Sequence, residues 1–514
     1  MHASSANIGN HSSIFALKIP LSMCGGYLTP VLLITMALGG CAVGPDFKSP
    51  PVPSLLGDSY TSTALPPRTD AAPGTAGTAQ TFAYGKNLPD QWWTLFHSVA
   101  LNQLIQSALK QNPTLASAQA SLRQVQENYN AEAGTLNYPS VNGKLGATRE
   151  RAQFSGTTPT VATLYNASVN VSYTLDVFGA SSRQLESLRA AVDYQKFAVE
   201  AAYQALISNV ITTAIVEASL RAQYQATQEV LNIQQKQLTI VDKQLELGVV
   251  NRATVLAQRT QVAQTQALLS PLEKSLWQTR HQLAVYVGKL PSESGLPEFQ
   301  LSSLHLPENL PVSLPSELTR QRPDVRASEA LLHEASAQLG VATANQYPQI
   351  NLTGSYGDQR VVSGGSGVTS VLWNLGAGLT QPLFNGGALS AKRRAALAAY
   401  EQAEAQYRQT VLTAFQNVAD SLRAIESDAT TLSAQSNAEA LARESLDLGT
   451  QQYQLGVVNY LTLLNAQRSY QQAHINLVQA QAARFTDTVA LFLSLGGRWS
   501  NQPATSANTL PENR

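Results

Sequence analysis

The chain of 514 residues is poor in charge, in cysteine and in long hydrophobic runs. Charged residues make up 13% of it, about half the share usual in soluble domains. Its 34 basic and 34 acidic residues cancel, so the total charge gives no reason to expect nucleic acid as a partner. Two cysteines cannot support a disulfide framework. The mean hydropathy of -0.11 argues against a bundle of membrane-spanning helices, which needs several apolar runs of about 20 residues.

The sequence also has no recognisable catalytic or metal-binding pattern. Its seven His have no metal-ligand spacing, and it contains no P-loop, dinucleotide-binding glycine motif or nucleophile elbow. We interpret Gly364-Gly365-Ser366-Gly367 as a flexible loop between strands, and the acid pair Asp242 and Glu246 as part of a solvated helix face. The sequence therefore predicts a protein that is not an enzyme and holds no metal.

The N-terminus carries the pattern of an export signal. Residues 28–38 are apolar but too few to span a bilayer, and the tetrapeptide Leu-Gly-Gly-Cys41 that follows resembles the lipobox of bacterial lipoproteins. This resemblance implies a signal peptide over residues 1–40 and acylation of Cys41, whose covalent lipid is the only cofactor we expect. Because Ala42 rather than Asp follows the cysteine, sorting to the outer membrane is favoured. A buried N-terminal helix is the alternative.

Two further segments lack the periodicity of helices or strands. Residues 41–90 are rich in Pro, Ala, Thr and Gly, and we expect them to form a lipidated tether or a strap lying on the body rather than a domain. Residues 498–514 form a polar C-terminal tail.

The chain between these segments contains one unit twice. Four landmarks recur in the same order at an offset of about 208 residues, and one of them, Leu-Gly-Val-Val-Asn, is identical in both copies. The pairs are Asn112-Pro113 with Arg322-Pro323, Tyr138-Pro139 with Tyr347-Pro348, Phe178-Gly179 with Phe384-Asn385-Gly386, and residues 247–251 with 455–459. The sequence therefore predicts a tandem duplication, with repeat 1 over residues 91–300 and repeat 2 over residues 301–497.

Each repeat contains two segments in which apolar and polar residues alternate, as in a strand with one apolar face. We expect strands at about 140–152, 165–178, 348–360 and 371–384, joined in pairs by loops over 155–163 and 363–370. Such segments of about ten residues suit a lipid-facing barrel, and a soluble sandwich is the alternative. Four strands cannot close a barrel, because the smallest barrels use about eight, so two or three chains must share one.

A helix-compatible run of unusual length follows each strand pair. Residues 180–247 and 388–448 contain no Gly or Pro, and as helices they are about 100 Å and 90 Å long. Both runs far exceed a bilayer core of roughly 30 Å and carry many polar residues, so neither crosses lipid. The first run has two small or apolar stripes at seven-residue spacing, which allows helices to pack on both sides and to close into a cylinder; an ordinary long coiled coil is the alternative. The predicted fold is a mixed α/β membrane protein, with four antiparallel strands and long helices in each chain.

The repeated Leu-Gly-Val-Val-Asn motif marks a turn at the end of each long run. Gly248 and Gly456 supply the positive φ that commonly ends a helix, and return helices pass through Thr254 and Thr462. The two valines after each glycine form either an exposed docking patch or a staple that holds the turn together.

An ordered set of motifs runs through the chain from Cys41 to Trp499. It comprises Cys41-Ala-Val-Gly-Pro-Asp-Phe-Lys48, Trp92-Trp93-Thr-Leu-Phe96, Leu101-Asn-Gln-Leu104 and the doubled Leu-Gly-Val-Val turn. Together these motifs resemble the outer membrane factor family (TolC-like), and most closely its NodT/OprM-type lipoproteins of tripartite efflux systems. The resemblance implies a homotrimer, with a twelve-stranded barrel in the lipid of the outer membrane and a twelve-helix tunnel through the periplasm.

The resemblance also implies a function and partners. A periplasmic adaptor (membrane fusion protein) and an inner-membrane transporter of RND type would deliver drugs or other small molecules to the tunnel, which conducts them passively out of the cell. Matching the turn motif residue by residue gives an adaptor-docking tip of Gly248, Val249, Val250, Asn251, Gly456, Val457, Val458 and Asn459. A conduit for type I protein secretion is the alternative within the family.

The resemblance further places a gate at the periplasmic end of the tunnel. A ring of Leu in the family maps onto Leu461, and a ring of Asp maps onto Asn465, which is an amide here. Tyr453 matches a position that ties neighbouring helices together, and the acid that partners it in relatives is Thr254 here. Amides keep hydrogen bonding but carry no charge, so we hypothesise a gate that rests on apolar and amide contacts.

Two interpretations from other classes fit less well. A periplasmic adaptor lipoprotein would have one helical hairpin inserted into compact β-domains, not a whole unit repeated. A structural coiled-coil lipoprotein without a pore has no use for the alternating strands. The sequence therefore favours a channel.

Overall fold

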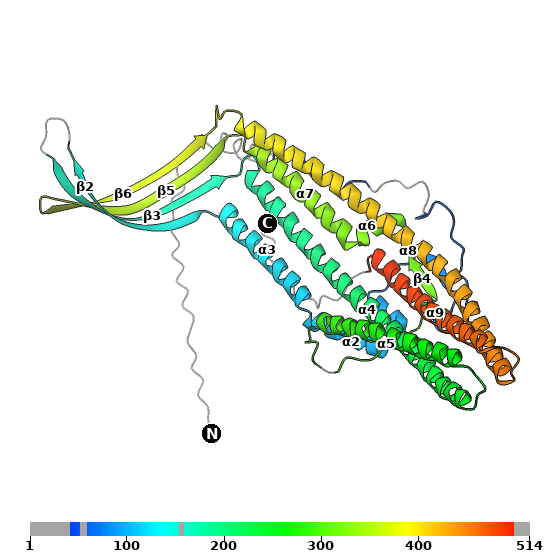
Figure 1. Ribbon diagram of the computed structural model, residues 1–514. Coiled ribbons are helices and arrows are strands. Elements are labelled where there is room, and N and C mark those ends of the chain that lie inside the picture. The colour runs from blue at the N-terminus through cyan, green and yellow to red at the C-terminus, as the bar shows by residue number, and fades with distance from the viewer. Residues whose placement is uncertain (1–41, 52–58, 154–158, 294, 498–514) are drawn as a thin grey trace, which may run out of the picture.

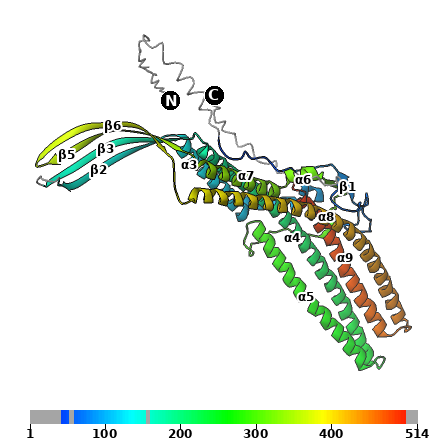
Figure 2. The same cartoon turned by 90° about the horizontal axis from the view of Figure 1, so that it is seen from above.

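The computed structural model describes residues 42–51, 59–153, 159–293 and 295–497. A curved sheet extends from one end of an elongated helical body, and two helical hairpins form the opposite end (Figures 1 and 2). The predicted signal peptide 1–40, the predicted lipidation site Cys41 and the predicted tail 498–514 lie outside the described residues.

The sheet has four antiparallel strands, as predicted. They are β2 (Ser140–Ala152), β3 (Thr160–Leu175), β5 (Gln349–Ser363) and β6 (Ser366–Thr380), in the spatial order β2-β3-β5-β6. Each repeat supplies one hairpin, and the two hairpins join where β3 pairs with β5. Within the described residues, no strand pairs with the outer edges of β2 and β6.

Several strand boundaries differ from prediction by three to five residues. β3 begins near 160 rather than 165 and ends at Leu175, and β6 spans 366–380 rather than 371–384. The expected flexible loop 363–370 is only a two-residue turn, in which Gly364 and Gly365 both have positive φ (58° and 84°). Such a turn matches the twist of the flanking strands, so pairing continues to Ser363 and Ser366. β6 ends just before Gln381-Pro382, because proline has no N–H for the strand ladder.

The register gives the sheet one apolar and one polar face. Residues directly opposite each other in an antiparallel pair share a face. One row of the apolar face contains Val141, Val171, Gly354 and Leu375, and the next contains Gly143, Val169, Tyr356 and Trp373. The opposite face carries rows such as Asn142, Asn170, Ser355 and Asn374. The large apolar side chains are exposed, Leu375 by 83%, so the sheet buries neither face within its own chain.

The long helices of the two repeats have equal lengths. α4 (Ala180–Glu246) and α8 (Ala388–Gln454) each have 67 residues, and the return helices α5 (Arg252–Tyr286) and α9 (Tyr460–Ser494) each have 35. α3 (Pro113–Asn137) and α7 (Pro323–Ala344) precede the two strand pairs. α8 thus continues beyond the Gly/Pro-free run 388–448 and ends at Gln454, just before the predicted turn at Gly456. Gly449 lies buried inside it, where an added Cβ would be 3.8 Å from Ala466 of α9.

α4 is the central helix of the body. It packs against α3, α5, α7 and α9, which agrees with the two-sided packing predicted from its stripes. It is the one described helix that by length and composition alone could cross a membrane, with an 18-residue window of mean hydropathy 1.3. Because 61% of that window is buried inside the chain, we assign it to the protein core.

The hydrophobic core sits where smaller elements surround the middle of the long helices. These elements are β1 (Thr81–Tyr84), which pairs in parallel with β4 (Asn309–Val312), two short 3-10 helices at Trp92–Phe96 and Leu301–Ser303, and the helices α2 (Val99–Gln111) and α6 (Pro315–Gln321). Trp92 and Phe492 are fully buried and their rings meet at 5.5 Å between centroids. This core fixes the two repeats to each other.

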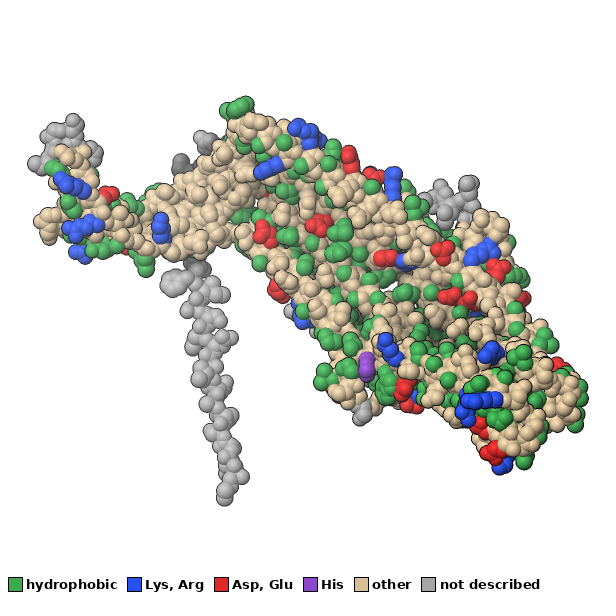
Figure 3. Space-filling view, in the orientation of Figure 1, with side chains coloured by type: hydrophobic (Ala, Val, Ile, Leu, Met, Phe, Trp, Pro, Cys, Tyr) green, Lys and Arg blue, Asp and Glu red, His purple; other side chains and the backbone are tan. Residues whose placement is uncertain are grey.

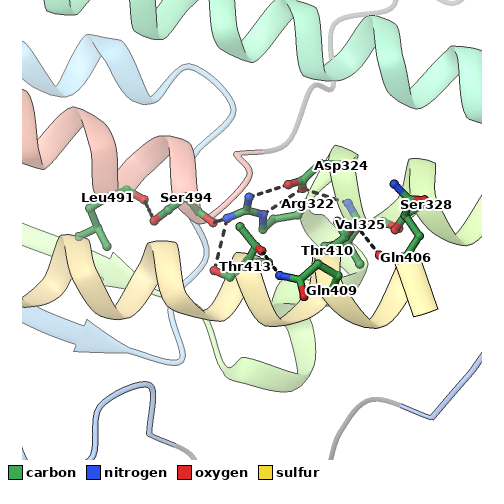
Figure 4. Close-up of polar contacts among 11 residues, drawn as sticks. Arg322, Asp324, Val325, Ser328, Gln406, Gln409, Thr410, Thr413, Leu491 and Ser494 are labelled. Atoms are coloured by element: carbon green, nitrogen blue, oxygen red, sulfur yellow. Dashed lines mark hydrogen bonds and ion pairs between the residues drawn. The ribbon is translucent and has the colours of Figure 1, made fainter. Parts of the chain in front are cut away.

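Both repeats use the same joint at the residue before the helix-starting proline, and Figure 4 shows the joint of repeat 2 around Arg322. In repeat 2, the Arg322 guanidinium binds both carboxylate oxygens of Asp324 and donates to the carbonyl of Ser494, near the end of α9, at 2.9 Å. In repeat 1, the Asn112 amide donates at 2.9 Å to the carbonyl of Tyr286, the last residue of α5. Each return helix therefore ends against the start of the helix that precedes the strands.

The first described residues lie along α4 and α7. Asp46 forms an ion pair with Arg183 at 2.6 Å, and Phe47 stacks on His333 with 4.3 Å between ring centroids. Gly44 adopts φ 104°, and a Cβ there would lie 2.7 Å from the Cα of Gly340. The chain that follows Cys41 thus passes so close to α7 at Gly44 that a side chain there would clash with Gly340.

Two carboxyl groups, Asp428 of α8 and Asp487 of α9, lie close together near the core. Burial and the neighbouring carboxyl of Asp487 raise the pKa of Asp428 to about 7, and the guanidinium of Arg484 opposes this rise. The pKa of a carboxyl group in an unfolded chain is about 4. The folded protein thus holds more protons than the unfolded one between about pH 4 and pH 7, so this pair lowers stability as pH rises through that window.

We therefore predict that Asp428→Asn makes the protein more stable than wild type above pH 7, by on the order of 1 kcal/mol after allowance for solvent screening. Thermal unfolding of both proteins from pH 4.5 to pH 8 measures the difference. Asp420→Asn, at an exposed position of the same helix, is the control. A difference between wild type and Asp428→Asn that does not grow with pH contradicts the assignment.

Candidate functional site

The two turns at the far end of the helical hairpins, which we call the tip, are built in the same way. α4 and α8 each end in a Schellman motif. Gly248 has φ 71° and donates to the Leu245 carbonyl at 3.0 Å, and Val249 donates to the Gln244 carbonyl at 2.8 Å. The second turn repeats this with Gly456 at φ 74° and with Val457 donating to Gln452.

The next helix of each hairpin starts on an asparagine cap. The Asn251 side chain accepts from the backbone N–H of Thr254 at 3.0 Å, and Asn459 accepts from Thr462 at the same distance. The Thr254 hydroxyl also donates to Asn251 at 3.1 Å. Because this hydroxyl serves the cap of its own helix, the structure does not bring Thr254 to Tyr453 as a latch.

The sequence left open whether the valines dock a partner or staple the turn, and the structure packs one valine of the first turn and exposes the other. Val250 packs against a small core at the tip formed by Val241, Val255, Leu463 and neighbouring side chains. Val249 and Val457 are exposed by 68% and 70%, beside Leu247 at 70% and Leu455 at 79%. These last four side chains form an apolar cap on otherwise polar hairpins, and we call them the tip cap.

Tyr453 lies between two helices of the tip. Its hydroxyl donates to the Gln244 side chain of α4 at 3.2 Å, and its ring meets Tyr460 edge to face at 5.4 Å. Burial raises the pKa of the Tyr453 phenol, so it stays a neutral donor at physiological pH. No pattern in the sequence pointed to Gln244 as this partner, because the resemblance indicated Thr254 instead.

Leu461 and Asn465 share one exposed face of α9. Leu461 is 61% exposed, and Asn465 makes no hydrogen bond to any described residue. Arg468, one turn further along the same face, binds the side chains of Gln261 and Gln264 on α5. Sequence analysis missed Arg468, although its helical spacing of three residues from Asn465 could have suggested it.

The sheet also carries charged side chains, and Figure 3 shows basic groups near its hairpin ends. Register places Lys144 and Glu150 on the polar face. It places Arg149, Arg151, Asp358 and Arg360 on the apolar face, with Asp358 in the same row as Leu145 and the three arginines in the rows beyond it. Charge on the apolar face is thus confined to the end of the sheet that lies away from the helices.

A sheet with a bare apolar face, continued by helices too polar to enter lipid, defines one subunit of a membrane channel. The sequence pattern of the outer membrane efflux protein family matches residues 104–289 and 314–497, one range in each repeat. The chain belongs to this family. It is accordingly an outer-membrane efflux channel component and not an enzyme, which confirms the recognition, the fold class and the main functional interpretation.

Individual relatives agree with this assignment. The chain is 32% identical to the pyoverdine export outer membrane protein OpmQ of Pseudomonas aeruginosa over 80% of this chain and 88% of that protein. It is 28% identical to the toluene efflux pump outer membrane protein TtgC of Pseudomonas putida, over 92% and 96%. Among solved structures, the outer-membrane channel OprN superposes with a TM-score of 0.78 at 26% identity, covering 89% of this chain and all of that one.

Proposed function

We propose that three copies of this chain close one continuous duct, through which small molecules leave the cell. The observation that carries this proposal is the four-stranded sheet, which has an exposed apolar face and two unpaired edges. Unpaired backbone groups are costly in lipid, so both edges require partners. Two copies would give eight strands, whose interior is only wide enough for side chains. Three copies give twelve and leave room for a passage lined by the polar face.

The internal repeat predicts how neighbouring chains pair. The hairpins β2–β3 and β5–β6 are equivalent, since Ser140 pairs with Ser172 as Gln349 pairs with Thr380. The observed β3–β5 junction, in which Val171 faces Gly354, then recurs between β6 of one chain and β2 of the next. In that junction Leu379 faces Leu145 of the neighbouring chain.

A chain carrying both Leu145→Cys and Leu379→Cys should therefore cross-link between subunits on mild oxidation. Denaturing gels should show a ladder that ends at three chains, because a closed ring has no free edge. Leu145→Cys with Val371→Cys, on the same face but eight residues away along β6, is the control and should stay monomeric. A ladder that ends at two chains or continues beyond three contradicts the proposal, and conductance of the uncross-linked wild type in planar bilayers tests the open duct independently.

The tip cap is the proposed docking surface for a periplasmic adaptor. Four exposed apolar side chains at the end of polar hairpins are costly in water, and covering them with a partner removes that cost. The adaptor and an inner-membrane transporter of RND type would supply the cargo, and the duct itself need not choose it. This fits the two relatives above, whose names concern pyoverdine and toluene.

We predict that Val249→Asp combined with Val457→Asp abolishes export while leaving trimers and bilayer conductance unchanged. Resistance of a deletion strain to a panel of toxic small molecules, after complementation, reports export. Val99→Asp is the matched control, because Val99 is equally exposed (71%) but lies on α2, away from the tip. Full resistance in the double variant places the docking surface elsewhere.

The proposed gate lies on the face of Leu461 and Asn465. In a threefold ring these side chains would narrow the tunnel with an apolar step followed by an amide step, neither of which carries charge. The Tyr453–Gln244 hydrogen bond would hold α8 against α4 and so keep the two hairpins of one chain together. We also propose that Cys41 carries the lipid anchor, since the residues that follow it are held against α4 and α7.

For this gate we predict that Asn465→Asp raises the cation preference of the channel, measured as the reversal potential across a salt gradient in planar bilayers. Three carboxylates near the axis attract cations into a narrow passage. Asn459→Asp keeps the helix cap and adds the same charge at the tip, so it should shift the potential less. Equal shifts from both variants mean that Asn465 does not line the constriction.

A further inference from the structure

The apolar face of the sheet ends in a charged border near the hairpin turns. From Ile350 to Asp358, about nine residues of β5 span the apolar rows, close to the length of a tilted membrane strand. Beyond these rows the same face carries Arg149, Arg151 and Arg360, all exposed. None of the three forms an ion pair within the part of the chain that the structure describes.

A groove leads from the apolar rows to this border. It has a volume of about 490 Å³ and is lined by Leu145, Ala147, Tyr165, Ala167, Asp358 and Arg360. The small side chains at 147 and 167 leave the hollow open, with Leu145 at its apolar end. Tyr165 pairs with Ala147 on one side and with Arg360 on the other, so one aromatic ring lies in the same row as the arginine.

The Arg360 side chain leans toward the hairpin turn. A Cβ added to Gly367 would lie 3.1 Å from its Nε and 3.3 Å from an Nη, although Gly367 pairs with Val362 and not with Arg360. The guanidinium therefore lies one row beyond its own backbone position, away from the apolar rows. A long basic side chain at a membrane boundary adopts this direction, with its stem on apolar surface and its charge in the headgroup layer.

We propose that this groove, on the outer wall of the barrel, binds a phosphate-bearing lipid of the outer leaflet. An acyl chain would lie over Leu145 and the two alanines, and the phosphate would meet the Arg360 guanidinium, which lines the groove. Arg149, which does not line the groove, would reach toward the phosphate from β2. Arginine suits this role, because its planar fork binds phosphate with two hydrogen bonds and stays charged. The apolar floor of the groove favours a lipid over a free anion, and tyrosine is typical of the level where headgroups begin.

The charges on the two faces make the site specific to the lipid side. The outer border has three arginines and one acid, Asp358, so each chain presents a net positive charge to the headgroups. The polar face of β2 has Lys144 and Glu150, six residues apart along the strand, and their two charges sum to zero. The proposal rests on the barrel proposed above, since only in a closed barrel does the apolar face meet lipid.

The test uses the full-length trimer in a nonionic detergent and measures bound lipid by native mass spectrometry. The probes are lipid A with two phosphates, the same lipid A without phosphates, and inorganic phosphate as a competitor. Wild type should prefer the phosphorylated form by about tenfold or more, the factor expected for a charge-assisted hydrogen bond to each guanidinium. Arg149→Gln with Arg360→Gln should remove this preference, and Asp358→Asn should strengthen it.

Lys144→Gln is the matched control, because it removes one positive charge from the same strand as Arg149 but on the polar face. It should bind lipid as wild type does. Equal binding of both lipid A forms to wild type, an unchanged preference in the double arginine variant, or full competition by millimolar inorganic phosphate would overturn the lipid site. Trimer formation and conductance, measured on the same preparations, report separately on the barrel, so loss of the barrel and loss of the lipid site are distinguishable.

Discussion

Among the described residues, the sheet of this protein leaves the backbone groups of its two outer edges without hydrogen-bond partners and its apolar side chains exposed. The rest of the structure follows from that constraint. Its outer edges expose N–H and C=O groups that lipid cannot solvate, and its apolar rows need a hydrocarbon environment. Further copies of the same sheet complete the edges, and the membrane covers the apolar face. The helical body contributes by holding two hairpins from distant parts of the chain at the angle where β3 meets β5.

The duplication explains how one chain maintains this geometry over such a length. Each repeat ends its return helix against the start of its own pre-strand helix, through Asn112 in one case and Arg322 in the other. An amide donates the hydrogen bond in one repeat and a guanidinium in the other, but both bind a carbonyl at the end of the return helix. The position of the joint is therefore the same in both repeats although its residues differ. The core around Trp92 and Phe492 then locks the repeats together midway between the membrane and the tip.

Much of this arrangement was predictable from the sequence. Period-two alternation located all four strands, and the identical Leu-Gly-Val-Val-Asn motifs located both turns. The differences from prediction arose at glycines, because glycine occurs in long loops but also in tight turns and at close contacts inside helices. Gly364 and Gly365 suggested a long loop but form a tight turn, and Gly449, which ends the Gly/Pro-free run, lies inside α8 and packs closely against Ala466. The partner of Tyr453 was not predictable, because its contact with Gln244 depends on how α4 and α8 lie together in three dimensions.

The equal lengths of the paired helices bring both turns of a chain to the same level, where they look alike in backbone and in valine content. Their surroundings differ in charge. Lys243 and Glu246 form an ion pair beside the first turn, whereas the matching positions beside the second are the amides Gln451 and Gln454. A ring of three chains would thus present six turns with the same backbone shape. Charged side chains flank three of these turns and amides flank the other three. A partner with repeated subunits could therefore fit all six turns by shape and still distinguish alternate turns by their charged side chains.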